Sequence, residues 1–396
     1  MHEEVITIIW LFAAAMIIAI VAHRLRLPYT VGLVLAGGGL AFTSFGAKFG
    51  LTRDLIFDVV LPPLLFEAAI NIRWTELKKD LPLVFALAIP GTIIAAAVTA
   101  WGMHAAFGWP WQAALLFGSL IAATDPVAVI AMIKEYRLSG RLRLVVEAES
   151  LFNDGVAAVL FILVSTWALA PAAPDAMEAA RTFLIEVGGG VLIGFAVGGA
   201  VLFIAGRSAD HMVEATLTTL AAYGAFQVAD SFGGSGVLAT VTAGLVIGNF
   251  GILGEEPAFL QAREFVLGLW EFIAFIASSF IFLEIGLTAG HLPFEKLGLV
   301  SAVGIIALVL LGRAVAVYPI CLGFTRTRWR VAPMAQHCLW WGGLRGALGL
   351  ALALSLPESM PWRDAILAAT IATVAFSIVA QGLTMKFLLQ RMSQEL

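Results

Sequence analysis

Charged side chains are scarce in this sequence, and their scarcity limits what the protein can be. Only 13% of the 396 residues are charged, whereas 61% are hydrophobic. A soluble globular protein carries about 25% charged and about 45–50% apolar residues. The composition therefore excludes a soluble enzyme and a disordered chain. The net charge of -4 also leaves no basic surface for a nucleic acid.

Cysteine and clustered histidine are lacking as well. Cys321 and Cys338 lie far apart in apolar stretches, so neither a disulfide scaffold nor a zinc site is expected. The 6 histidines are scattered without metal-ligand spacing, and no cofactor is expected. The sequence has long apolar runs instead, which indicate a chain that uses the bilayer as its solvent.

These apolar runs fill most of the chain. A helix needs about 20 apolar residues to cross a bilayer. The division between the eighth and ninth of the runs given below depends on a single short break, Gly233-Gly234-Ser235-Gly236. The fold class predicted is an all-α, polytopic membrane protein of about 13 transmembrane helices, a single unit over residues 1–396 with no soluble domain. The runs cover approximately residues 5–22, 28–45, 54–72, 81–107, 110–133, 142–169, 183–205, 213–230, 236–253, 265–289, 297–324, 331–356 and 365–389.

Positive charge is distributed unequally between the two sets of loops that these spans create. Of the 23 Lys and Arg residues, two lie inside spans, and most of the others share one set of loops. The positive-inside rule places that set in the cytoplasm, with the N-terminus outside and the C-terminus cytoplasmic. The acidic start lacks the basic region of a signal peptide, so we expect a retained first helix in a protein of the cell (inner) membrane. The other set of loops holds only Lys48, Arg53, Arg181, Lys296 and Arg363.

Several ionisable residues fall within the apolar runs. A charge at the bilayer centre costs about 2.5–3.5 kcal/mol on insertion scales, so each is a candidate functional residue. Asp58, Asp230 and Glu271 lie near span ends, where the simpler interpretation is that they reach the interface. The others are Glu67, Asp125, Glu149, Asp154, Glu284, Arg313 and Arg345.

Asp125 lies in Ala123-Thr124-Asp125-Pro126, in the middle of the fifth run. Proline lacks a backbone donor and disfavours helix in the residue before it, so the helix is expected to break here. Broken helices near the bilayer midplane expose carbonyl oxygens and helix ends to bound ions in many transporters. A proline kink, with Asp125 bonded to the freed backbone, is the structural alternative.

The sixth run carries a polar patch. Ser150 and Asp154 are four residues apart and share one helix face, and Glu149 and Asn153 share the adjacent face. Oxygen-rich patches suit hard cations such as sodium, and a carboxylate in a low-dielectric site has a raised proton affinity. Competition between a cation and a proton for such carboxylates is the basis of cation/proton exchange. A buried structural network is the alternative.

Two arginines, Arg313 and Arg345, lie within spans, and a buried arginine requires a carboxylate partner. Glu149 is the leading candidate for that partner. Glycines at 342, 343, 346 and 349 surround Arg345 and suggest a second interrupted helix, seven spans after the first. Paired interruptions indicate an inverted-repeat transporter, whereas close helix packing is the plainer explanation of the glycines.

The third run contains Leu61-Pro62-Pro63-Leu64-Leu65-Phe66, followed by Glu67. The double proline predicts a kink, and Glu67 comes about one turn later. A role as a gate, a supporting role behind the ion ligands and a purely structural role all stay open for Glu67.

Together these motifs resemble the monovalent cation/proton antiporter superfamily, in particular the sodium/proton exchangers of the NhaP and NHE type. The resemblance covers nearly the whole chain, and it is specific because four motifs occur in order on matching spans. The motifs are Leu61-Pro62-Pro63-Leu64-Leu65-Phe66, Thr124-Asp125-Pro126-Val127-Ala128, Glu149-Ser150-Leu151-Phe152-Asn153-Asp154-Gly155 and Gly343-Leu344-Arg345-Gly346-Ala347.

The resemblance implies a mobile core domain and a dimerisation domain, with helices five and twelve unwound and crossing near the ion site. Core helices would come in part from residues 54–169 and 265–391, and dimerisation helices in part from residues 1–45 and 180–289. A homodimer working by elevator-like alternating access is implied as well. The short C-terminal end departs from the relatives that carry a cytoplasmic regulatory tail.

The resemblance also implies residue roles at the ion site. Asp154 would bind the cation and the competing proton, and Asp125 would be the second carboxylate ligand of the cation. Ser150 and Thr124 would complete the shell. Asn153, also expected among the cation- and proton-binding residues, corresponds to the Asn of an Asn-Asp pair that is typical of the electroneutral branch.

Outside that shell, the resemblance implies a structural ion pair between Glu149 and Arg313, and Arg345 matches the arginine of helix twelve. A role as a gate or behind the ion ligands stays open for Arg345, as it does for Glu67. The sequence thus predicts a secondary antiporter, and not an enzyme, that exchanges sodium (or lithium or potassium) for protons. Potassium/proton or ammonium/proton exchange uses the same ligand types and remains an alternative. A cation channel is less favoured. An intramembrane enzyme with Asp125 and Asp154 as a catalytic pair is also less favoured, since neither Asp has a protease-like context.

Overall fold

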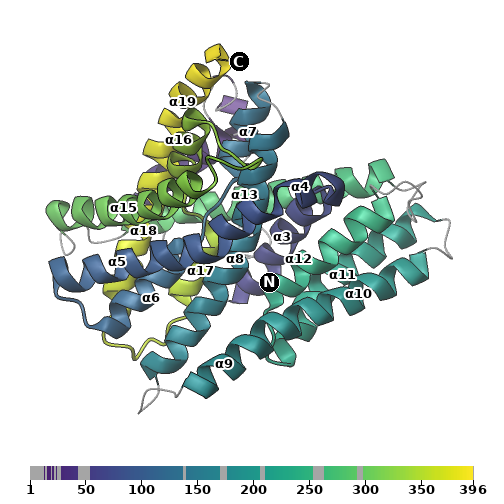
Figure 1. Cartoon of the computed structure of the whole chain (residues 1–396), viewed down its shortest axis with the longest axis horizontal. Coiled ribbons are helices and arrows are strands. Elements are labelled where there is room, and N and C mark those ends of the chain that lie inside the picture. Colours follow the sequence, from purple (N-terminus) through teal and green to yellow (C-terminus); the bar gives the residue numbers. More distant parts are fainter. Residues whose placement is uncertain are drawn as a thin grey trace.

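A computed structural model shows a helical chain (Figure 1). It describes residues 28–42, 54–136, 140–169, 176–205, 210–252, 263–291 and 298–395, together with a few residues between 13 and 24. In these residues the regular structure is α-helix, with short π-helical segments labelled η. The elements are α2 (Tyr29–Ala41), η2 (Leu55–Val60), α3 (Leu61–Ile70), α4 (Trp74–Ala86), η3 (Leu87–Gly91), α5 (Thr92–Phe107), α6 (Trp111–Ala122), α7 (Val127–Glu135), α8 (Gly140–Leu169), α9 (Ala176–Leu184), η4 (Ile185–Gly189), α10 (Gly190–Ala205), α11 (His211–Ser231), α12 (Gly236–Val246), η5 (Ile247–Ile252), α13 (Arg263–His291), α15 (Leu299–Gly323), α16 (Pro333–Trp341), α17 (Ala347–Leu354), α18 (Arg363–Phe376), η6 (Ser377–Gln381) and α19 (Gly382–Glu395).

The predicted all-α, polytopic architecture is confirmed. Each expected span from the second to the thirteenth falls on one helix or on consecutive helices. The first expected span, 5–22, lies largely outside the described residues, as do Lys48, Arg53 and Lys296. Within the described residues, 6 continuous helices are long and apolar enough to cross a membrane, namely Trp74–Phe107, Gly140–Leu169, Ala180–Ala205, Arg263–Gly290, Leu299–Gly323 and Arg363–Met392.

The fourth span begins earlier than the apolar run indicated. Its helix starts at Trp74, whereas the run starts at residue 81. The added turns contain charged side chains, among them Glu76, Lys78 and Lys79, that are exposed outside the apolar stretch. A hydropathy window finds the part of a helix that matches the bilayer, and the helix itself can continue beyond it.

Two helices are interrupted at the centre of the fold. Between α6 and α7 the chain leaves the helix at Ala123, whose ψ of 138° is extended. Between α16 and α17 the chain is likewise non-helical from Gly342 to Gly346. These breaks coincide with the two interruptions that the sequence indicated at Asp125-Pro126 and among the glycines of residues 342–349.

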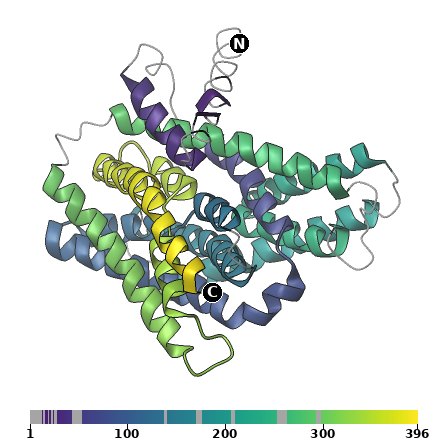
Figure 2. The same ribbon diagram turned by 90° about the horizontal axis from the view of Figure 1, so that it is seen from above.

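The helices pack in two groups on either side of α8. On one side, α5 packs on α6 and α15, and α16 packs on α19. On the other side, α10, α11 and α12 lie side by side, with α12 against α3. Figure 1 shows the first group on the left and the second at lower right, and Figure 2 shows the same separation from above.

Helices α2 and α13 run closely against each other. A Cβ atom on Gly37 would overlap the carbonyl oxygen of Leu283, and one on Gly286 would overlap that of Val34. Glycine at these two positions therefore allows the backbones to meet directly, as small residues do in membrane helix pairs.

Candidate ion-binding site

The two interrupted helices cross and are joined through their main chains. The backbone N–H of Asp125 donates to the carbonyl oxygen of Leu344 at 2.7 Å, and the two residues form an isolated antiparallel bridge. Pro126 precedes the first turn of α7, where a missing backbone donor costs little. The crossing therefore holds Thr124 and Asp125 next to Arg345 and Gly346, although about 220 residues separate them in the sequence.

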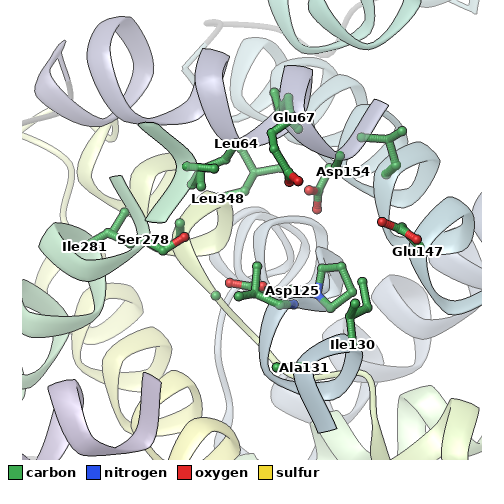
Figure 3. A pocket seen from close by; sticks show the side chains of 18 of the residues that line it. Leu64, Glu67, Asp125, Ile130, Ala131, Glu147, Asp154, Ser278, Ile281 and Leu348 are labelled. Carbon is green, nitrogen blue, oxygen red and sulfur yellow. Dashed lines mark hydrogen bonds between the residues drawn. The ribbon is translucent and has the colours of Figure 1, made fainter. Parts of the chain in front are cut away.

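A cavity of about 540 Å³ opens beside this crossing, and both Asp125 and Asp154 line it. Residues of α2, α3 and α13 form one wall, and residues of α7, α8 and α17 form the other. Figure 3 shows Glu67, Asp154 and Glu147 along the upper part of this space and Asp125 below them. Two carboxylates sharing one cavity cannot both stay ionised at low cost unless a cation or a proton joins them.

The two aspartates differ in the hydrogen bonding of their Oδ1 atoms. Asp125 Oδ1 accepts a hydrogen bond of 3.0 Å from the backbone N–H of Val127 at the start of α7. Among the described residues, Asp154 Oδ1 is buried and has no hydrogen-bond partner. A buried oxygen without a donor is costly, so Asp154 has the coordination left over for a cation or a proton.

Two hydroxyl groups lie with the aspartates. Thr124 Oγ1 and Ser150 Oγ are 2.8 Å apart and hydrogen-bonded, and both residues are buried. Ser150 lies one turn before Asp154 on α8, as the i, i+4 spacing indicated. The contact ties the broken segment of α6–α7 to the unbroken helix α8.

Glu149 and Arg313 form a buried ion pair between α8 and α15. Arg313 Nη1 lies 2.7 Å from Glu149 Oε1 and Nη2 lies 3.0 Å from Oε2, with side-chain exposures of 4% and 2%. Arg313 Nη2 also donates to the carbonyl oxygen of Leu339, near the end of α16. The amide of Asn153 donates to Glu149 Oε1 at 3.2 Å. Asn153 is therefore bonded to this pair, next to Asp154 in the chain.

Arg345 is bonded to carbonyl oxygens. Its Nη1 donates to the carbonyl oxygens of Ala122 and Ala123, at 2.7 and 3.2 Å. Those carbonyls end α6, where the helix dipole leaves a partial negative charge. Sequence reasoning looked for a carboxylate partner, but the broken helix end supplies the negative charge for Arg345. Its own backbone N–H donates to Ser377 Oγ at 2.9 Å, which anchors the crossing to η6.

Glu67 lies on α3, across the cavity from α8. Its Oε1 accepts a hydrogen bond of 2.9 Å from the Asn71 amide on the next turn of the same helix. The prolines before it coincide with the change from the π-helical segment η2 to α3, which is a recognised cause of helix bending. Glu67 therefore faces the ion site from the wall that the interrupted helices do not form.

Gly346 allows the two interrupted helices to approach each other closely, because it has no side chain. A Cβ atom at this position would overlap the carboxylate of Asp125. We expect Gly346→Ala to displace Asp125 and to lower the transport rate by about 100-fold, the cost of a displacement of about 1 Å at a reacting group. Ion flux in proteoliposomes measures this rate.

Gly199→Ala is the matched control, because a Cβ on Gly199 would meet no atom within 4 Å. That variant should transport like the unaltered protein. Normal transport by Gly346→Ala would show that the position of Asp125 does not matter.

The remaining membrane-depth acids lie away from this arrangement or at its edge. Asp58 and Asp230 are exposed, and Asp58 Oδ1 accepts a bond from Gln227. Glu271 is exposed at the edge of the cavity. Glu284 is buried on α13 and does not line the cavity.

The sequence analysis singled out none of the other charged residues that line the cavity. These include Glu147, Lys134 and Arg143. The spacing from Glu147 to Asp154 is seven residues, which places both on one face of α8. That spacing was the signal available in the sequence.

Comparisons with known proteins agree with the fold and with the motifs. A family model described as "Sodium/hydrogen exchanger, transmembrane" matches residues 11–391. The chain is 38% identical to the Na(+)/H(+) antiporter ApNhaP of Aphanothece halophytica, covering 93% of this chain and 70% of that protein. It is 31% identical to the Na(+)/H(+) antiporter NhaH of Halobacillus dabanensis, covering 99% and 98% of the two.

A solved structure shares the fold. The sodium proton antiporter MjNhaP1 of Methanocaldococcus jannaschii superposes with a TM-score of 0.75, covers 99% of both chains and is 20% identical in sequence. At this identity the likeness concerns the arrangement of helices alone.

Proposed function

Because this chain belongs to the transmembrane sodium/hydrogen exchanger family, we propose that it exchanges sodium for protons with Asp154 as the residue that carries the exchanged ion. The family consists of transporters rather than enzymes. The observation that carries the residue assignment is the buried, unpartnered Oδ1 of Asp154 in a cavity that it shares with Asp125.

The geometry supports an exchange cycle with two loaded states. In one state a dehydrated sodium ion binds Asp154, with oxygens of Asp125, Thr124 and Ser150 nearby. In the other state a proton occupies Asp154. Both states neutralise the carboxylate, and a neutral site crosses a low-dielectric barrier at less cost than a bare charge. The empty, ionised site is the one that does not cross, so the two fluxes are coupled.

We propose that the exchange is electroneutral. Asn153 cannot titrate, and its amide is bonded to Glu149. Glu149 is in turn held by two bonds from Arg313. Asp154 is then the group that changes its proton or cation load in each cycle, which gives one sodium ion for one proton.

The mobile and static parts follow the two walls of the cavity. We propose that α6, α7, α8 and α17 move as part of the core, while α2, α3 and α13 stay with the static part of a homodimer. Lys134 on α7 and Arg143 on α8 line the cavity. They flank one of the connections in the set of loops rich in positive charge, so the cavity is proposed to open to the cytoplasm. Labelling of single cysteines from each side of the membrane tests the orientation. The molecular mass of the protein in lipid nanodiscs tests dimerisation.

The direct test is ion flux in proteoliposomes carrying the purified chain and a pH-sensitive dye. Sodium should release an imposed proton gradient, without any dependence on membrane potential. Lithium, potassium and ammonium are compared in turn, because the same oxygen ligands suit them. Protons compete for Asp154, so the apparent KM for sodium should rise as the pH falls while the maximal rate is retained. A response to potassium alone would replace sodium in the proposal, and no cation response would refute it.

A further inference from the structure

Arg143 and Glu147 form an ion pair on the wall of the cavity. Arg143 Nε lies 3.4 Å from Glu147 Oε2, four residues apart on α8, with side-chain exposures of 36% and 12%. Both residues line the cavity. The contact is longer than the 2.7 Å of the buried Glu149–Arg313 pair, so it is the looser of the two ion pairs.

Glu147 and Asp154 lie on one face of α8. Leu151 lies between them, and all three line the cavity, as their spacing of four and seven residues requires. At 1.5 Å per residue, Glu147 is about 10 Å and Arg143 about 16 Å from Asp154 along the helix axis. Figure 3 shows the Glu147 carboxylate directed into the same space as that of Asp154.

The other charges on the cavity lie around this pair. Lys134 on α7 lies on the same wall, and Glu67 and Glu271 lie on the opposite wall, on α3 and α13. A cleft with low-dielectric walls focuses the field of the charges that line it. The occupancy of Asp154 by a cation therefore depends on the charges along the cavity wall as well as on the groups that touch the ion.

We propose that Arg143 and Glu147 are a positioning pair that sets the apparent sodium affinity of Asp154 through the field in the cavity. Glu147 attracts the entering cation, and Arg143 opposes it. Neither residue touches the bound ion, since both are too far along α8. The inference rests on the proposed exchange of sodium for protons at Asp154.

The test is the apparent KM for sodium in proteoliposomes. A unit charge about 10 Å away changes binding by up to about 15-fold at an effective dielectric near 20, and solvent screening lowers this. Glu147→Gln should therefore raise KM by about threefold to tenfold. Arg143→Gln should lower KM by about twofold to fivefold, because it is farther away and more exposed. The KM of the double variant should lie between those of the two single variants, and the maximal rate should change little in all three.

Charge-conserving variants separate the field from packing. Arg143→Lys and Glu147→Asp should keep the KM of the unaltered protein, and they remain informative if a glutamine variant fails to fold. Arg73 and Glu76 supply the matched control, since they form an exposed i, i+3 pair at 3.8 Å that does not line the cavity. Arg73→Gln and Glu76→Gln should leave KM unchanged.

The outcomes distinguish this inference from the function on which it rests. Shifts of KM in the same direction for both glutamine variants, or no shift in either, would overturn the inference while sodium/proton exchange by the unaltered protein still stood. The inference is supported if KM is unchanged in the charge-conserving variants and shifts in opposite directions in the two glutamine variants. An unaltered protein that does not exchange sodium for protons overturns both.

Discussion

Replacing Asp154 by Asn is expected to abolish sodium/proton exchange. The amide has almost the same shape as the carboxylate, so the packing of α8 should be kept, but it can neither release a proton nor neutralise a cation. Asp125 remains, but its Oδ1 is already bonded to the backbone of Val127. Sodium-dependent dissipation of a pH gradient in proteoliposomes should fall to the rate of protein-free vesicles.

Asp58→Asn is the matched control for this variant. Asp58 is exposed, is bonded to Gln227 and does not line the cavity, so its replacement should leave exchange unchanged. Gel filtration should show a single symmetric peak for both variants if they are folded. Normal exchange by Asp154→Asn would rule out Asp154 as the carrier and leave Asp125 as the group to test.

Arg313→Ala is expected to destabilise the protein severely. It leaves Glu149 as an uncompensated charge that is 2% exposed, and removing one partner of a buried pair costs about 3–5 kcal/mol. The bond from Arg313 to the Leu339 carbonyl is lost as well. The melting temperature in detergent should therefore fall by many degrees, whereas the ratio of sodium to lithium transport in the protein that remains folded should be unchanged.

Glu149→Ala should act in the same way, because it strands the guanidinium of Arg313. A double variant, Glu149→Leu with Arg313→Met, removes both charges and should recover part of the lost stability. A fully stable Arg313→Ala protein with altered selectivity would contradict the assignment and would place Arg313 among the groups that choose the ion.

The sequence was most informative about features that neighbouring residues along the chain determine. Pro126 after Asp125 predicts a break in the helix because proline acts on its immediate neighbours, and the structure has non-helical residues there. The i, i+4 spacing places Ser150 near Asp154 for the same reason. Apolar runs located the helices, but they could not show that α4 continues through the charged residues before residue 81.

Contacts between distant helices could not be read in the same way. Arg345 reaches the carbonyls of Ala122 and Ala123 on another helix, and the sequence carries no mark of which carbonyls a broken helix leaves free. The opposite wall of the cavity, with Glu67 near α8, depends on how α3 and α13 pack against the core. Helix periodicity fixes faces within one helix, while packing between helices fixes which faces meet.

The bond from the Asp125 N–H to the Leu344 carbonyl uses main-chain atoms alone. Any residue other than proline at position 125, and any residue at position 344, offers the same donor and acceptor. The bond that joins the two interrupted helices therefore does not depend on the side chains that bind the ion. Redesign of the ligands at positions 124, 125 and 150 can alter which ion is carried without dismantling the joint that presents them. An engineer can therefore keep the crossing and change the ion ligands, provided that position 346 remains glycine, because a Cβ there would overlap Asp125.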